Sequence, residues 1–120
     1  DNYKLAKKIS EEEKKNGKKL KHFIQVNIGM EEQKNGIDID NLNDFYHHCN
    51  QELNLNVIGL MCIPPQSVSV KDFFLKMTQL NKSLGLNELS MGMSSDYMTA
   101  IECGSTFVRI GSKIFGERIK

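Results

Sequence analysis

The stretch that decides the fold is Val57-Ile58-Gly59-Leu60-Met61-Cys62-Ile63, followed by Pro64-Pro65. It is an almost unbroken apolar run, which is typical of a strand that is covered by other elements on both faces. The two prolines end the run because proline has no backbone N–H for a strand ladder. Strands of this type belong to parallel sheets wrapped by helices, so the run predicts an α/β fold.

On both sides of this strand the chain alternates between helical and strand patterns. Asp38 or Asp40 can cap the second helix, and Gly17 and Gly85 are expected to stop the first and third. Such alternation predicts a parallel sheet with right-handed crossovers. The expected helices cover 3–16, 41–53, 70–84 and 94–101 with a last turn from 111, and the expected strands cover 22–28, 57–63, 89–91 and 106–110.

Among folds with alternating helices and strands, the sequence favours a barrel over a dinucleotide-binding fold. The glycine-rich loop and downstream acidic residue of a dinucleotide fold are missing from the sequence. A complete barrel of eight units takes roughly 200 residues or more. The 120 residues here supply four expected strands. We therefore predict a single domain over 1–120 that is half of a (β/α)8 TIM barrel, with four parallel strands alternating with helices.

Half a barrel has two open sheet edges, and open edges tend to pair with another chain. We therefore expect a homodimer through these edges, unless the native protein is longer than this chain. Side chains of a strand alternate between its two faces, so either of two sets can line the inner face of the half barrel. One set is Ile24, Val26, Ile58, Leu60, Met91 and Val108, and the other consists of the residues that alternate with them.

Composition excludes several classes of protein. With 16 basic and 15 acidic side chains the formal charge is +1, so no global field attracts nucleic acid or an anionic membrane. The longest apolar run is far shorter than the ~20 residues of a membrane span, and the first segment is not signal-like. Cys49, Cys62 and Cys103 lack the spacing of a zinc site or a disulfide framework. We expect a cytoplasmic protein with reduced thiols that binds neither nucleic acid nor membrane.

Two loops of the predicted half barrel have the composition of a phosphate site. They cover 92–96 and 109–112 and follow the last two expected strands, where barrels frequently hold phosphate. Glycine and serine at the start of a helix offer unpaired N–H groups and hydroxyl donors to an anion. The same residues also serve as ordinary caps and tight turns, so the spacing alone leaves both interpretations open for Gly92, Ser94, Ser95, Gly111 and Ser112.

Arg109 is a separate signal because it places a permanent charge at the expected mouth of the barrel. Arginine has no acceptor and keeps its proton. Next to a pyridine nitrogen it would therefore keep that nitrogen unprotonated. A salt bridge to a neighbouring carboxylate is the plain alternative.

Five strings of residues occur in a characteristic order along the chain. They are Phe23-Ile24-Gln25-Val26-Asn27-Ile28, Lys34-x-Gly36, the run from Gly59 to Pro65, Leu89-Ser90-Met91-Gly92-Met93-Ser94-x-Asp96, and Gly104-Ser105-Thr106-x-Val108-Arg109-Ile110-Gly111-Ser112-x-Ile114-Phe115-Gly116. Through these strings the chain resembles, over essentially all 120 residues, the pyridoxal-phosphate homeostasis proteins, which are themselves similar to the barrel domain of alanine racemase.

The resemblance implies a protein that binds, buffers and delivers pyridoxal 5'-phosphate without established turnover. It implies that Ser94, and less directly Ser95, bind the phosphate through hydroxyl and N–H groups. Arg109 would face the pyridine nitrogen, as the arginine of racemase-like proteins does. The remaining residues implied at the cofactor are Gly111 and Ser112, which complete the phosphate cradle, and Met61 and Met93, which either flank the ring or pack in the core.

One departure from the family pattern bears on the chemistry. The lysine that forms the Schiff base stands at the end of the first barrel strand in the family, and the strings around it are missing here. We therefore interpret the chain as the C-terminal half, with a phosphate cradle but no covalent anchor. Cofactor binding is expected to be non-covalent at most.

Two other functions remain as alternatives. A racemase-type or decarboxylase-like enzyme on the same barrel needs that lysine and a second proton-transfer group. Tyr3, Tyr46 and Tyr97 are poor candidates for it because they fall on expected helices. We therefore expect no enzyme. The other alternative is a binder of a different phosphorylated ligand, such as a sugar phosphate.

Overall fold

The computed structural model describes residues 2–32, 36–65, 69–109 and 118–119. The predicted order of helices and strands is confirmed within these ranges, with boundaries shifted by a few residues. The helical turn expected from residue 111 lies outside them. The elements are α1 (Asn2–Asn16), β1 (Lys21–Gln25), α2 (Ile39–His47), the π-helical turn η1 (His48–Glu52), β2 (Asn56–Met61), α3 (Val70–Ser83), β3 (Glu88–Ser90), α4 (Tyr97–Glu102), β4 (Val108–Arg109) and β5 (Arg118–Ile119).

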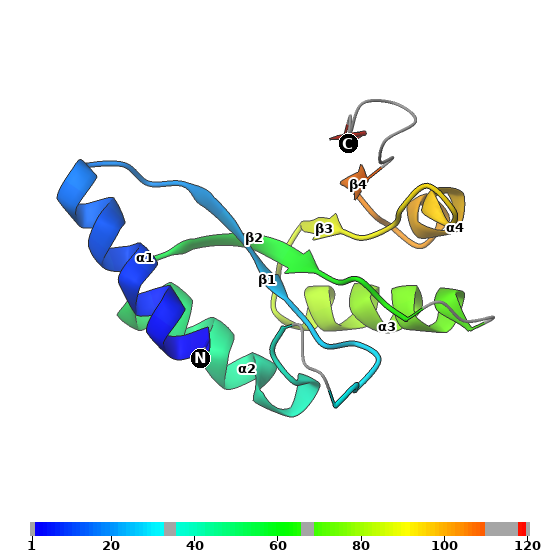
Figure 1. Cartoon of the computed structure of the whole chain (residues 1–120), viewed down its shortest axis with the longest axis horizontal. Coiled ribbons are helices and arrows are strands. Elements are labelled where there is room, and N and C mark those ends of the chain that lie inside the picture. The colour runs from blue at the N-terminus through cyan, green and yellow to red at the C-terminus, as the bar shows by residue number, and fades with distance from the viewer. Residues whose placement is uncertain (1, 33–35, 66–68, 110–117, 120) are drawn as a thin grey trace.

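The sheet is parallel, as predicted, with the strand order β1-β2-β3 (Figure 1). The structure shows three strands in this sheet, and the fourth strand expected at 106–110 is not confirmed. The described part of that segment is joined to β3 by a parallel bridge between Ser90 and Phe107 and by hydrogen bonds from the Met91 N–H to the Phe107 carbonyl and from the Phe107 N–H to the Leu89 carbonyl, each 3.1 Å long. It then forms β4, which pairs with β5 in the antiparallel sense.

Side-chain hydroxyls explain why this fourth pairing is irregular. The Leu89 N–H donates to Thr106 Oγ1 at 2.8 Å instead of to a backbone carbonyl. Ser105 Oγ lies 2.7 Å from the Met91 carbonyl and 2.8 Å from that of Phe107. Because hydroxyls take the place of ladder partners, residues 105–107 are bonded to β3 without extending the regular sheet.

The two faces of the sheet differ in what covers them. Ile24, Leu60 and Leu89 stand in register on neighbouring strands, and all three are buried in one core with the helices. The opposite face carries Phe23, Gln25, Met61 and Ser90, which are only half-buried; we call these four residues the open face. Two sets of side chains were possible for the inner face. Ile24 and Leu60, from the first set, pack against the helices, and residues that alternate with them form the open face.

Helix α3 covers the sheet with a tightly fitted face. Phe74 and Met77 are fully buried, and Asn81 joins them as a buried polar residue. The Asn81 side chain accepts the Leu60 N–H at 3.1 Å and donates to the carbonyls of Leu86 and Glu88 at 3.2 and 2.9 Å. One amide therefore satisfies three backbone groups at the junction of α3, β2 and β3.

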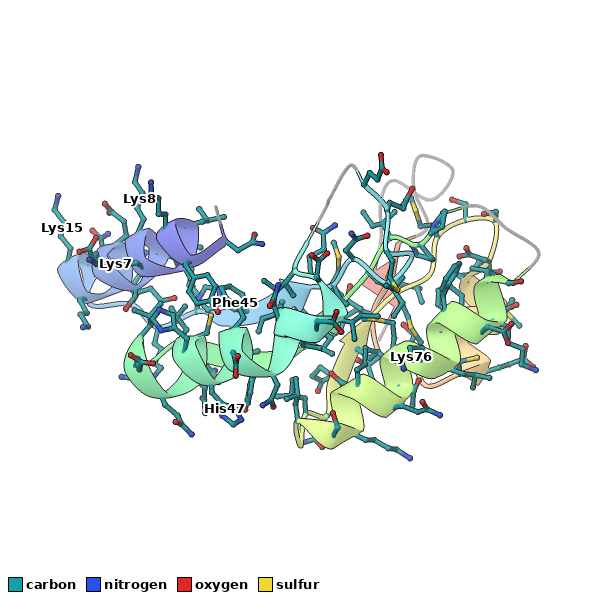
Figure 2. All side chains as sticks on the ribbon, turned by 90° about the horizontal axis from the view of Figure 1, so that it is seen from below. Lys7, Lys8, Lys15, Phe45, His47 and Lys76 are labelled. Atoms are coloured by element: carbon teal, nitrogen blue, oxygen red, sulfur yellow. The ribbon has the colours of Figure 1, made fainter. Side chains whose placement is uncertain are left out.

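Helix α1 packs against α2 and β1 through a few separate contacts. The rings of Tyr3 and Phe45 meet edge to face with centroids 5.0 Å apart, and Ser10 Oγ donates to the Leu53 carbonyl at 2.7 Å. His22 Nε2 lies 2.5 Å from Glu13 Oε2. A cavity of about 280 Å³ remains among α1, α2 and β1. Figure 2 shows Phe45 between α1 and α2, while the labelled lysines of α1 point away from the sheet.

None of the helices in the described ranges is long and apolar enough to cross a membrane. Cys49, Cys62 and Cys103 are buried and unpaired.

Candidate functional site

The carboxyl ends of β1, β2 and β3 point the same way, and the loop from β3 to α4, residues 91–96, lies at that end (Figure 1). Its backbone is fixed by Gly92, which has a φ of +103°. A Cβ at this position would lie 2.6 Å from the Ala100 Cβ and 3.3 Å from Val108 Cγ1. Gly92 is therefore required both for its left-handed backbone and for the close approach of α4.

Asp96 closes the same loop from the other side. Its carboxylate accepts the Met93 N–H at 2.7 Å, and its own N–H donates to the Met93 carbonyl at 3.1 Å. Asp96 is also the N-cap residue of α4. Between these fixed points Ser94 and Ser95 are exposed, and their hydroxyls make no hydrogen bond to the described part of the chain. The loop thus presents two hydroxyls on a backbone that is held by other residues.

The Asp96 carboxylate also affects a thiol nearby. Burial, together with the negative charge of Asp96, raises the pKa of the Cys62 thiol to about 12. Burial likewise raises the pKa of Cys49 to about 11. Both thiols remain protonated near neutral pH, so neither has the thiolate character of a nucleophile.

The structure brings some of the predicted cofactor residues to one end of the sheet. Met61 ends β2 on the open face, in register with Gln25 and Ser90, and Met93 is exposed in the 91–96 loop beside the two serines. For Arg109 only the backbone, in β4, is described. The other two cradle residues, Gly111 and Ser112, lie outside the described residues.

Asn27 was given no role from the sequence, and the structure shows that it organises the loop after β1. Its side chain is buried; it donates to the Glu31 carbonyl at 2.9 Å and accepts the Glu31 N–H at 3.2 Å. It also lies 3.4 Å from Asp38 Oδ1. A polar residue between Val26 and Ile28 in an apolar run was the sequence signal that could have identified this role.

Within the described ranges, no lysine stands at the carboxyl end of a parallel strand. Lys21 begins β1 at the opposite end, and the other described lysines lie on α1, on α3 or in the turn after α1. No group of three histidine, cysteine or acidic residues in these ranges could hold a metal ion. The chemistry that this end of the sheet offers is hydrogen bonding from serine hydroxyls, together with apolar contact from methionine.

Comparison with known proteins identifies relatives along the whole chain. The family model described as the alanine racemase N-terminal domain matches residues 1–119. A pyridoxal phosphate homeostasis protein of Aquifex aeolicus is 39% identical over 127 residues, covering 98% of this chain and 56% of the relative. The human protein of the same name is 38% identical over 133 residues, covering 98% of this chain and 48% of the relative. The chain thus spans about half the length of these curated relatives.

Solved structures show the same fold. PipY of Synechococcus elongatus, solved without pyridoxal phosphate, superposes with a TM-score of 0.81 at 27% identity, covering 95% of this chain and 58% of PipY. The structure of PipY with pyridoxal phosphate bound superposes with a TM-score of 0.81 at 26% identity, covering 95% of this chain and 57% of PipY. An uncharacterised protein of Bifidobacterium adolescentis gives a TM-score of 0.80 at 31% identity, covering 93% of this chain and 49% of that protein.

Proposed function

Because this chain belongs to the alanine racemase N-terminal domain family, we propose that it is a pyridoxal-phosphate-binding part of a cofactor homeostasis protein. It binds the cofactor non-covalently at the carboxyl ends of β2 and β3 and catalyses no reaction itself. The observation that carries this proposal is the 91–96 loop: Gly92 and Asp96 fix its backbone while the hydroxyls of Ser94 and Ser95 stay exposed.

In this proposal the two serine hydroxyls donate to the phosphate group. Neither serine hydroxyl makes a hydrogen bond within the described part of the chain, so both can donate to a phosphate without breaking an existing bond there. Arg109, Gly111 and Ser112 complete the site as the family resemblance implies, and Met61 and Met93 lie against the ring. The Asp96 carboxylate holds the loop and is itself an anion, so the charge of a phosphate dianion has to be balanced by a cation such as Arg109.

The positions of the described lysines support non-covalent binding. A covalent link to the cofactor aldehyde needs an amine at the carboxyl end of the strands, and Lys21 is at the other end of β1. The positions of the tyrosines also favour a carrier: Tyr3 packs on Phe45, and Tyr46 and Tyr97 lie on the helices α2 and α4. We therefore propose a carrier in place of a racemase-type enzyme.

The architecture we propose is half a (β/α)8 barrel that associates with a second copy. Among the described residues, the outer edge of β1 is paired at its end, where Ile37 bridges Val26. Next to this edge, Leu5 and Leu20 are exposed apolar residues of α1 and the following turn. Light scattering at micromolar concentration tests this part: a dimer is expected, Leu5→Lys with Leu20→Lys should shift it toward monomer, and a wild-type monomer contradicts it.

Titration calorimetry and absorbance test the binding proposal directly. Wild-type protein should bind pyridoxal phosphate at least tenfold more tightly than inorganic phosphate, which corresponds to about 1.4 kcal/mol. A double Ser94→Ala, Ser95→Ala variant should lose about tenfold in affinity for both ligands, and Arg109→Ala should lose mainly the preference for the cofactor. Ser83→Ala is the matched control, because the exposed Ser83 hydroxyl bonds only to Leu80 within α3.

Two results would overturn the proposal. If phosphate binds as tightly as the cofactor, the loop is a plain anion site; if neither binds, the loop is structural. Borohydride reduction followed by mass spectrometry tests whether the cofactor binds non-covalently. A cofactor adduct on any described lysine would contradict non-covalent binding.

A further inference from the structure

Three exposed apolar side chains surround the carboxyl end of the sheet. Met30 follows β1 and is 74% exposed, Ile63 follows β2 and is 46% exposed, and Met93 follows β3 and is 42% exposed. Each comes from a different loop, although all three loops leave the sheet at the same end (Figure 1). We call Met30, Ile63 and Met93 the apolar rim.

Contacts between neighbouring loops bring the three loops together. The loop that carries Met30 lies against the segment after Ile63, because a Cβ at Gly29 would come within 2.7 Å of Pro65 Cδ. On the other side, the Cys62 N–H donates to the Ser90 carbonyl at 3.2 Å. The charge of Asp96, which holds Met93, acts on the Cys62 thiol. The three loops that carry the rim residues therefore lie next to one another at this end of the sheet.

Met30 adopts a backbone conformation that a side chain disfavours. Its φ is +53°, and the other described non-glycine residue with a positive φ is Asn54, a type that tolerates it. Buried Asn27 maintains this conformation, because its carbonyl accepts the Met30 N–H at 3.1 Å and its side chain bonds twice to Glu31. Strained residues persist where the surroundings hold them and tend to occur at functional sites. Here the strain coincides with a methionine that is almost fully exposed.

The charges beside the rim indicate what kind of surface it fits. Glu31 and Glu32 are exposed immediately after Met30. A protein that takes up a phosphorylated cofactor needs positive potential around its own pocket in order to hold a dianion. Acidic groups at the mouth of a donor are complementary to such a pocket, and complementary charge favours encounter and orientation. Methionine side chains are flexible and polarizable, so one rim can fit several acceptor surfaces.

We propose that the apolar rim docks an acceptor protein during cofactor transfer. The acceptor has a cofactor pocket that opens on an apolar surface flanked by lysine or arginine side chains. This inference rests on the proposed function, because it gives the carrier a surface for delivery. The cofactor passes between two non-covalent sites, and the rim brings their mouths together.

The experiment uses a purified pyridoxal-phosphate-dependent aminotransferase in its cofactor-free form as the probe. Its complex with the full chain is measured by fluorescence anisotropy at low and high salt, with and without cofactor. Met30→Gly and Ile63→Gln should each weaken the complex about tenfold, and Glu31→Gln with Glu32→Gln should reduce its salt dependence. Met98→Gln, at an α4 methionine that is 61% exposed, is the matched control and should leave the complex unchanged.

Met30→Gly separates a docking role from a structural one. Glycine adopts positive φ without strain, so this variant should melt at the same temperature as wild type or higher while it loses docking. Neither Met30 nor Ile63 contacts the cofactor in the proposed site, so cofactor titrations of their variants should match wild type.

The proposal is overturned if the rim variants bind the aminotransferase as wild type does, or if Met98→Gln weakens the complex equally. Because docking is also measured without cofactor, a chain that docks but fails to bind the cofactor contradicts the proposed function and not the rim.

Discussion

The helices share one core with the sheet, and the part of this core next to α3 (the α3 side) is stabilised differently from the part next to α1 (the α1 side). On the α3 side, Phe74, Met77 and Ala100 are fully buried, and polar side chains such as Asn81 and Ser105 bond to backbone groups of the strands. On the α1 side, Ala6 is the buried apolar residue of the helix, and Tyr3, Ser10 and Glu13 make separate ring and hydrogen-bond contacts beside a pocket of about 280 Å³.

This difference indicates which part of the chain can hold the residues of a binding site in a fixed geometry. A backbone that is packed without voids and bonded by buried polar groups keeps its geometry, whereas a helix with few contacts can open locally. The 91–96 loop belongs to the packed side, since Gly92 fits closely against Ala100. The α1 side offers exposed apolar residues, which suits association with another surface better than binding of a small ligand.

Replacing Asn81 should produce the largest loss of stability. Asn81→Ala leaves the Leu60 N–H and the carbonyls of Leu86 and Glu88 without the partner they have now. Buried backbone groups without partners are costly, so we expect a loss of about 3 to 5 kcal/mol in the free energy of unfolding. Urea denaturation measures it. Exposed Asn87 is the control, and a loss no larger than that of Asn87→Ala would show that the α3 side does not depend on this amide.

Gly92→Ala tests how tightly the site loop is packed. The substitution combines a disfavoured positive φ with a Cβ placed 2.6 Å from that of Ala100. We expect a loss of about 2 to 4 kcal/mol, because backbone strain and overpacking add. Gly85→Ala is the matched control: Gly85 also has a positive φ, of +73°, but a Cβ there meets nothing within 4 Å. Equal melting temperatures for the two variants would argue against close packing at Gly92.

On the α1 side a single hydrogen bond should matter less. Ser10→Ala removes the bond from Ser10 Oγ to the Leu53 carbonyl, and we expect a loss of about 1 kcal/mol. Hydrogen exchange should show faster opening of α1 amides while α3 amides are unaffected. Ser83→Ala, which removes a bond within α3 on the surface, provides the baseline. Uniformly faster exchange over both helices would mean that the two sides unfold as one unit.

The sequence predicted the order of elements because periodicity and turn residues are local signals. The apolar run before Pro64 was identified as a buried strand, and the structure has β2 at Asn56–Met61. The stop at Gly17 was also correct, with a φ of +66° there. The fourth strand of the sheet is not confirmed. Ser105 and Thr106 bond to the β3 segment through their side chains, and such bonds leave no periodic pattern in the sequence.

The candidate site could be predicted only in part, because several of its hydrogen bonds depend on the folded conformation and leave no pattern in the sequence. Glycine and serine in the 91–96 loop were visible as residue types, but the closing role of Asp96 depends on a bond to Met93 that the loop conformation creates. Asn27 and Asn81 were overlooked because buried amides act through contacts that are distant in sequence or set by a turn. The exposure of Met30 likewise depends on its backbone conformation and not on its neighbours in sequence.

The smallest expected effect is a pH-dependent one on the α1 side. The hydrogen bond from His22 holds the pKa of the Glu13 carboxyl below its ordinary value of 4.5; burial opposes this shift, and the Leu20 N–H supports it. A lowered pKa means that the ionised carboxylate is favoured in the folded state. Its contribution is therefore fully present above about pH 4.5 and is lost as the pH falls through the lowered pKa.

Comparison of wild type with Glu13→Gln in urea denaturation at several pH values should reveal this. The stability difference between the two proteins should shrink toward zero as the pH falls below 4.5 and through the lowered pKa of Glu13. Glu12→Gln, one residue away and exposed, removes an equal charge without the bond to His22. If both variants show the same pH profile, general charge on α1 and not the Glu13–His22 contact links this helix to β1.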